Sequence, residues 1–326
     1  MNILYTINQK YIDIMLTSLY SLIKNSKLDK IKLYIVTLDF AKEDYDKIKR
    51  FIDNFSNVEI YTYSLEDNPI DKYNIPSWRG SQIANARLFY PRIIKEEHNI
   101  DNLLYIDSDT LVINSLKELN EYNDYTINAC KEGMSLKSYY HSLDLNKYYN
   151  TGVLYFNLNK WLDLDLEDRI KYLFKNNKYN ITFPDQDTLN IVLKDEIKTM
   201  PQRYNMSVYP YLFNEKEMKL FYNDKYRQSG YNEMLKEKEK ATILHSLGLF
   251  NIKPWTNNKV NPFTKEFMDY MEKVNPNFQL EELSILKKIL TISPELFKMI
   301  IIVRTYLPEK LEEKNRNLSM KLQKAR

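Results

Sequence analysis

The 326-residue chain has little cysteine, little glycine and no long apolar run. Its single cysteine, Cys130, cannot form a disulfide within the chain, which excludes a disulfide-stapled fold and fits a reducing compartment. No stretch approaches the roughly 18 apolar residues that a membrane-spanning helix needs. The start, MNILYTI, lacks the basic region and long apolar segment of a signal peptide. We therefore expect a cytoplasmic protein that does not span a membrane.

A strong net charge is also missing. The formal charge is +3, which is too small to indicate nucleic-acid binding, so we expect no nucleic-acid partner. The charge is uneven, because residues 284–326 carry a net +6 and residues 1–283 a net −3. We predict two parts: a globular body at 1–283 and a basic amphipathic helical tail at 284–326, broken at Pro294 and Pro308.

The first third of the chain alternates between strand and helix patterns. Strands are predicted at 2–7, 31–37, 57–63 and 102–107, the first and the last of them buried, and helices at 11–25, at 42–53 and from 81 up to Pro91. This order is typical of an α/β fold with a mostly parallel sheet and helices on both faces. Ligands of such sheets bind beyond the carboxyl ends of the strands, where Asn8, Tyr11 and Asp107 fall.

The second half gives three more elements. A strand is predicted at 148–158, entered through Asn150, Thr151 and Gly152, and a helix at 184–195 with Pro184 in its first turn. A short strand at 241–245 ends in His245.

The stretch LLYIDSDTLV (103–112) places Asp107, Ser108 and Asp109 directly after a buried strand. Two carboxylates at this spacing can ligate a hard divalent cation that also holds phosphates. Asp and Ser also favour turns and helix caps, which is the structural alternative. A third reading makes Asp107 the nucleophile of a haloacid-dehalogenase-like phosphatase. The Gly-Asp pair that commonly introduces the downstream acids of those enzymes does not occur here.

A second motif is LHSLGLFNIKPW (244–255). His245 ends a strand, Gly248 permits a close backbone approach, and Lys253 places a cation beside Pro and Trp. Imidazole is a common third metal ligand next to carboxylates, although a lone histidine is more often structural.

Taken in order, these motifs resemble those of the retaining family-8 glycosyltransferases, which have a GT-A fold. The resemblance covers about residues 1–260 and rests on YTINQKY, ANARL, LLYIDSDTLV, YYNTGVLYFNLNKW, PDQDTLN and HSLGLFNIKPW. It implies transfer of a hexose from UDP-galactose or UDP-glucose to a saccharide or lipid-linked saccharide, in surface polysaccharide synthesis.

The resemblance also implies roles for individual residues. Metal ligands for Mn²⁺, with Mg²⁺ as the alternative, would be Asp107, Asp109 and His245. Catalytic residues beside the transferred sugar would be Asp185 and Gln186, and Gln186 favours front-face attack because an amide is a poor nucleophile. Residues that bind the UDP-sugar would also include Asn8, Tyr11, Arg87, Ser108, Asn150, Gly152, Gly248 and Lys253.

Two features depart from the family pattern. Asn8 stands where the family usually has Asp next to the uracil, and an amide can still donate and accept there. Between His245 and Lys253 lie more residues than the family usually has. The chain therefore either bulges here, or Lys253 reaches the phosphates differently.

The basic tail has two readings: a solvated helical cap on the body, or a segment that lies on the anionic inner face of a membrane. For the whole protein, two alternatives to glycosyl transfer stay open. One is a phosphohydrolase with Asp107 as nucleophile, and the other is a non-catalytic protein that binds nucleotide-sugars.

Overall fold

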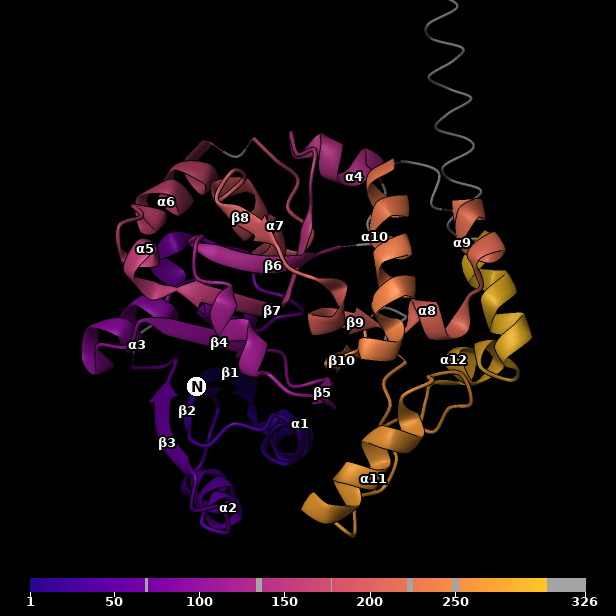
Figure 1. Ribbon diagram of the computed structural model, residues 1–326, viewed down its shortest axis with the longest axis horizontal. Coiled ribbons are helices and arrows are strands. Elements are labelled where there is room, and N and C mark those ends of the chain that lie inside the picture. Colours follow the sequence, from indigo (N-terminus) through magenta and orange to yellow (C-terminus); the bar gives the residue numbers. More distant parts are fainter. Residues whose placement is uncertain (68–69, 133–136, 177, 222–224, 248–251, 304–326) are drawn as a thin grey trace, which may run out of the picture.

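A seven-stranded sheet forms the centre of the computed structural model, which describes residues 1–67, 70–132, 137–176, 178–221, 225–247 and 252–303 (Figure 1). The strand order is β3-β2-β1-β4-β7-β6-β8, and all neighbours are parallel except β4–β7 and β7–β6. The predicted mixed, mostly parallel α/β sheet is therefore confirmed. The strands are β1 (Asn2–Asn8), β2 (Ile31–Leu38), β3 (Val58–Ser64), β4 (Asn102–Ile106), β6 (Ile127–Lys131), β7 (Tyr149–Asn157) and β8 (Ile197–Thr199).

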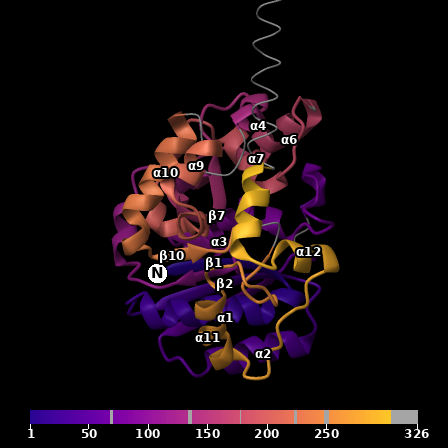
Figure 2. The same ribbon diagram turned by 90° about the vertical axis from the view of Figure 1, so that its right-hand side faces the viewer.

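Helices cover both faces of this sheet because its strands are apolar on both sides. Along β1, Ile3, Tyr5 and Ile7 pack against α1 (Ile12–Asn25) and α2 (Lys42–Ile52), whereas Leu4 points to the opposite core. That opposite core is closed by α3 (Tyr90–His98), α5 (Leu158–Leu162), α6 (Leu166–Asn176) and α7 (Pro184–Val192). Figure 2 shows α1 and α2 together on one side of the strands.

The segment 81–94 is not the helix that the sequence predicted. A 3₁₀ helix, η3 (Ile83–Leu88), comes first, and α3 then begins at Tyr90 with Pro91 in its first turn. Proline lacks an N–H group, but the first turn of a helix needs none, so Pro91 starts a helix where we expected it to end one. This arrangement buries Arg87 at the end of η3.

A second, three-stranded sheet was not predicted. It has the order β5-β10-β9 and consists of β5 (Thr110–Val112), β10 (Ile243–His245) and β9 (Met206–Ser207). β5 begins directly after Asp109, and the register pairs Thr110 with His245. The small sheet therefore brings two motifs that are far apart in the sequence to one place.

A third core lies beside the small sheet and includes residues of α8 (Tyr209–Leu212), α9 (Glu215–Phe221), α10 (Lys225–Glu237), α11 (Thr264–Val274) and α12 (Ile285–Leu290). Tyr204 of η5 (Gln202–Asn205) is buried in the core that α1 shares, and Tyr140 of α4 (Lys137–Ser142) packs in a small separate cluster with Tyr148. A further helix covers 294–303, and its Phe297 and Ile301 are buried in the same core as Trp255 and Phe267. The division at residue 284 stays a prediction, and Pro308 lies outside the described residues. Within the described ranges, no helix is long and apolar enough to cross a membrane.

Candidate functional site

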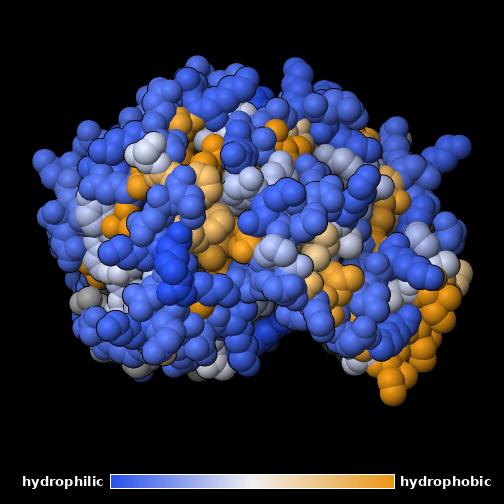
Figure 3. Space-filling view, turned by 90° about the horizontal axis from the view of Figure 1, so that it is seen from below, coloured by the Kyte–Doolittle hydropathy of each residue, from blue (hydrophilic) through white to orange (hydrophobic). Residues whose placement is uncertain are grey.

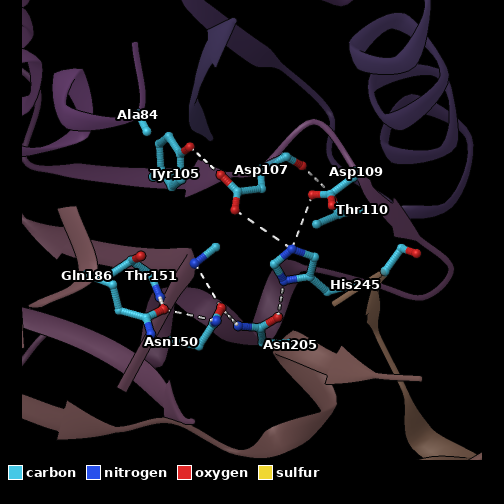
Figure 4. A network of polar contacts seen from close by, with 12 residues as sticks. Ala84, Tyr105, Asp107, Asp109, Thr110, Asn150, Thr151, Gln186, Asn205 and His245 are labelled. Carbon is cyan, nitrogen blue, oxygen red and sulfur yellow. Dashed lines mark hydrogen bonds and ion pairs between the residues drawn. The ribbon is translucent and has the colours of Figure 1, made fainter. Parts of the chain in front are cut away.

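Three potential metal ligands meet where the two sheets adjoin (Figure 4). The chain turns after β4, and Thr110 Oγ1 donates a hydrogen bond to the carbonyl oxygen of Asp107 at 2.8 Å. His245 Nε2 lies 3.1 Å from Asp109 Oδ1 and 3.7 Å from Asp107 Oδ2. One ligand atom from each of the three residues lies within 4.8 Å of the others. Two carboxylates and an imidazole are a donor set that suits a divalent cation such as Mn²⁺.

Gly152 of β7 leaves the space that the imidazole fills. Its carbonyl oxygen accepts a hydrogen bond from the Asp107 N–H at 2.8 Å, which joins β7 to the acidic turn. A Cβ atom on Gly152 would lie only 2.1 Å from His245 Cε1 and 2.8 Å from Asp107 Oδ2. The cluster in this form therefore requires glycine at position 152.

Lys253 forms an ion pair with Asp109. Its Nζ contacts Asp109 Oδ2 and donates to the carbonyl oxygen of Ser246 at 2.9 Å. Burial would raise the pKa of Asp109, but the charges of Lys253 and His245 outweigh burial and hold that pKa well below its usual range. Lys253 thus reaches the acidic cluster despite its longer spacing from His245, whereas Gly248 lies outside the described residues.

Arg87 connects the acidic turn to α7. Arg87 is 6% exposed, and its guanidinium lies 3.0 Å from Asp107 Oδ1 through Nη2 and 3.3 Å from Asp185 Oδ2 through Nε. Burial opposes its charge, but the two carboxylates outweigh burial and raise the pKa of Arg87 above its ordinary value. Arg87 Nη1 also donates to the carbonyl oxygen of Thr151 at 2.8 Å. The Arg87 guanidinium is therefore held in place by three different segments of the chain.

The first turn of α7 carries Asp185 and Gln186 into the same region. Thr151 Oγ1 donates to Asp185 Oδ2 at 3.0 Å, and Gln186 Oε1 accepts from Asn150 Nδ2 at 3.1 Å and from the Thr151 N–H at 3.2 Å. Burial raises the pKa of Asp185, and Arg87 opposes that rise. The amide oxygen of Gln186 is thus held by two donors.

Asn8 and Tyr11 lie at the carboxyl end of β1. Asn8 Oδ1 is buried and has no hydrogen-bond partner among the described residues, which leaves an acceptor for a ligand. The Tyr11 ring packs edge-on against Trp255 with 6.1 Å between centroids. Burial raises the pKa of Tyr11, and the nearby charges of Lys253 and Asp109 act on it in opposite directions. Tyr11 therefore lies close enough to Lys253 and Asp109 to feel their charges, and Ser108 is half-buried in the turn itself.

Two more polar residues, Asn205 and Glu132, complete the network, and no sequence motif indicated Asn205. Asn205, at the end of η5, contacts both His245 and Asn150 at 2.8 Å. Glu132, just after β6, accepts a hydrogen bond from Asn150 Nδ2 at 2.9 Å. An isolated Asn in QRYNMS carries no local signal, because only the small sheet brings it beside His245.

The chain is similar in sequence to curated glycosyltransferases. A putative glycosyltransferase of Haemophilus influenzae is 31% identical over 222 residues, which are 64% of this chain and 63% of that protein. A lipopolysaccharide 1,2-glucosyltransferase of Escherichia coli is 26% identical over 279 residues, covering 78% of this chain and 79% of the relative.

Solved structures show the same fold. The galactosyltransferase LgtC in complex with donor and acceptor sugar analogs superposes with a TM-score of 0.67 at 19% identity, over 84% of this chain and 96% of LgtC. An active-site mutant of LgtC gives a TM-score of 0.68 with the same coverage. The mixed sheet and its flanking helices are therefore a GT-A fold.

The model of the family described as "Glycosyl transferase family 8" matches residues 2–259, which include β1, the acidic turn, α7, His245 and Lys253. The chain belongs to glycosyl transferase family 8 and is a glycosyltransferase.

Proposed function

We propose that the protein is a retaining, metal-dependent hexosyltransferase that moves galactose or glucose from a UDP-sugar to a saccharide or lipid-linked saccharide. The observation that carries the proposal is the two-sided site. Asp107, Asp109 and His245 form a candidate cation site, and Asp185 and Gln186 face it across Arg87. Breaking a sugar–diphosphate bond builds negative charge on the phosphates and positive charge on the sugar, and these two sides match those charges.

On the phosphate side, Asp107, Asp109 and His245 would hold Mn²⁺, with Mg²⁺ as the alternative. Such a cation supplies Lewis-acid stabilisation of the leaving diphosphate. Lys253 would exchange its contact with Asp109 for one with the diphosphate, because the cation neutralises Asp109 in its place. Arg87 would add a second positive charge between the phosphates and the sugar.

On the sugar side, Asp185 and the amide oxygen of Gln186 would stabilise positive charge at the anomeric carbon. The two donors on Gln186 Oε1 lower its nucleophilicity further, which supports front-face attack over a covalent intermediate. Asn150 and Gly152 would line the sugar. Asn8 and Tyr11 would bind the uracil through a hydrogen bond and a ring contact, and Ser108 would lie along the nucleotide.

Half-exposed aromatic rings beside α7 support a saccharide acceptor. Trp78 and Tyr139 both contact Phe183, with centroid distances of 5.5 and 5.8 Å, and Phe183 immediately precedes the first turn of α7. Rings of this kind stack on sugar faces. The similarity to a lipopolysaccharide 1,2-glucosyltransferase supports a place in surface polysaccharide synthesis.

The segment 280–303 supports contact with an anionic membrane, from the cytoplasmic side. Figure 3 shows an apolar projection at one corner of the molecule. Seven large apolar residues of this segment are 38 to 79% exposed, with Lys287, Lys288 and Lys298 between them: Leu280, Ile285, Leu286, Ile289, Ile292, Met299 and Val303. Exposed apolar side chains among cations are typical of interfacial segments.

Flotation with anionic and with neutral vesicles tests this contact. We expect the wild-type protein to float with anionic vesicles and a variant with Ile285, Leu286 and Ile289 replaced by serine to stay at the bottom. Equal flotation of both proteins would contradict the proposed membrane surface, without touching the proposed chemistry.

A donor panel tests the enzymatic proposal. The purified protein is incubated with UDP- and GDP-sugars, with Mn²⁺ or EDTA, and free nucleoside diphosphate is followed, with D109A as the blank. We expect manganese-dependent release of UDP from one UDP-hexose. Phosphate release from simple esters instead would favour the phosphohydrolase with Asp107 as nucleophile, and UDP binding without turnover would favour the non-catalytic alternative.

A further inference from the structure

Asn205 lies between the candidate metal ligand His245 and the sugar-side residue Asn150, and it is 3% exposed. Its Oδ1 is 2.8 Å from His245 Nδ1, and its Nδ2 donates to Asn150 Oδ1, also at 2.8 Å. Asn150 Nδ2 in turn donates to Gln186 Oε1 at 3.1 Å. Two buried amides thus link the metal side to the sugar side (Figure 4).

The orientation of both amides follows from one backbone group. The Gly152 N–H can only donate, and it donates to Asn150 Oδ1 at 2.9 Å. Asn150 must therefore turn its NH₂ group towards Gln186 and Glu132. The group of Asn205 that faces Asn150 Oδ1 must then be its NH₂, and Asn205 Oδ1 is left facing the imidazole.

An oxygen at that position accepts a hydrogen bond, so His245 Nδ1 must carry the proton. Nε2 would then offer its lone pair to a cation held with Asp107 and Asp109. Partners that fix the tautomer and the ring orientation of a ligating histidine raise metal affinity. The ring has little other freedom, because Gly152 lies directly against it on another side.

We propose that Asn205 is a positioning residue with two separable roles. Its oxygen holds His245 in the tautomer and orientation that bind the cation, and its NH₂ group keeps Asn150 turned so that Asn150 donates to Gln186. The inference rests on the proposed metal-dependent glycosyl transfer and adds a physical link between the two halves of that site.

Two substitutions at this position separate the roles. N205A removes both hydrogen bonds. N205D keeps an oxygen acceptor for His245 but places an oxygen against Asn150 Oδ1. Asn150 then meets either this second oxygen or, with its amide turned, the Gly152 N–H, and in both cases its hydrogen bond to Gln186 is disturbed. A matched control is N128A, because Asn128 is an equally buried amide whose contacts, to the carbonyl oxygens of Tyr122 and Tyr155, lie outside the site.

The experiment combines calorimetric titration with MnCl₂ in the presence of UDP and steady-state kinetics on the UDP-hexose that the wild type uses. For N205A we expect the Kd for Mn²⁺ to rise about 10- to 100-fold. For N205D we expect a Kd equal to or tighter than that of wild type, a kcat about 10- to 100-fold lower and an almost unchanged KM. N128A is expected to lower Tm and to change neither constant.

Each result has a distinct meaning. Wild-type Mn²⁺ affinity in N205A would overturn the role towards His245, and wild-type kcat in N205D would overturn the role towards Gln186. Equal losses in both constants for N205A, N205D and N128A would reduce Asn205 to a packing residue. Wild-type protein that neither binds Mn²⁺ nor releases UDP would overturn the proposed function itself, and this inference with it.

Discussion

Replacing Gly152 by alanine tests the geometry of the metal side directly. The added Cβ would lie 2.1 Å from His245 Cε1, and ordinary contacts begin at 3.4 Å, so the imidazole must retreat by about 1.3 Å. The ring is 1% exposed and its Nδ1 contacts Asn205 Oδ1, so a retreat of this size disturbs the contacts that position the imidazole. Overpacking of this kind costs about 1–3 kcal/mol of folding free energy.

The same displacement should abolish tight metal binding. Metal–ligand distances tolerate deviations of roughly 0.2 Å, and a misplacement of about 1 Å in a reacting site costs on the order of 100-fold in rate. For G152A we therefore expect a Tm several degrees lower, Mn²⁺ binding weakened at least tenfold and kcat reduced by about two orders of magnitude. Differential scanning calorimetry, Mn²⁺ titration and UDP release measure the three effects.

The chain offers a matched control in Gly230. It lies within α10, and a Cβ there would meet nothing closer than Lys131 side-chain carbons at 3.9 Å. Alanine in a helix interior is more stable than glycine by up to about 1 kcal/mol, so G230A should raise Tm slightly and leave activity unchanged. If G152A behaved like G230A, the imidazole would not lie against Gly152 and the proposed ligand set would be wrong.

Three further predictions follow from other contacts. Because the pKa of Asp109 is depressed in the folded protein, its ionised carboxylate stabilises the fold above the unfolded pKa of about 4, and this stability is lost as pH falls through the folded pKa. D109N should therefore lower Tm at pH 7 by more than it does below pH ~4 in thermal melts. An equal shift of Tm at both pH values would contradict the ion pairing. W78A should remove a ring that stacks on the acceptor, so the KM for the acceptor should rise roughly two- to tenfold while UDP-sugar hydrolysis stays unchanged in steady-state assays. A changed rate of hydrolysis would place Trp78 at the donor instead. F297A should lower the free energy of unfolding by about 3–5 kcal/mol in chemical denaturation, because Phe297 is fully buried in the core that contains Trp255. I289A should lower it little, because Ile289 is half-exposed. Equal effects of the two substitutions would make residues 284–303 a detached tail.

Much of the fold could be predicted from local pattern. The strands predicted at 2–7, 31–37 and 57–63 alternate with helices, and each lies within a residue or so of its predicted bounds. These strands could be predicted because each is a short, mostly apolar run of residues, and such a run can be recognised without knowing the tertiary structure. Pro91 was misread because a proline fits either the first turn of a helix or the residue just past its end, and the sequence alone does not choose between them.

The charged residues of the candidate site could be predicted from the sequence, but the hydrogen bonds that connect them through neutral side chains could not. Asp107 and Asp109 follow a buried strand, and Arg87, Asp185 and His245 gave signals as chemistry-bearing residues in recognisable motifs. Asn205 gave none, because its importance comes from η5 and the small sheet, which pair segments far apart in the chain. The role of a neutral amide depends on the residues that it contacts, and these contacts are set by the tertiary structure.

The charges of the site explain why cation and nucleotide-sugar should bind as a unit. Three carboxylates of the site already have a cationic partner: Asp109 has Lys253, and Asp107 and Asp185 share Arg87. A divalent cation alone would displace Lys253 and leave a buried ammonium without a counter-charge, which is unfavourable. A diphosphate arriving with the cation cancels the added charge and gives Lys253 a new partner. Mn²⁺ should therefore bind more tightly with UDP than without it, and K253M should weaken this coupling more than it weakens binding of Mn²⁺ alone, which paired calorimetric titrations would resolve.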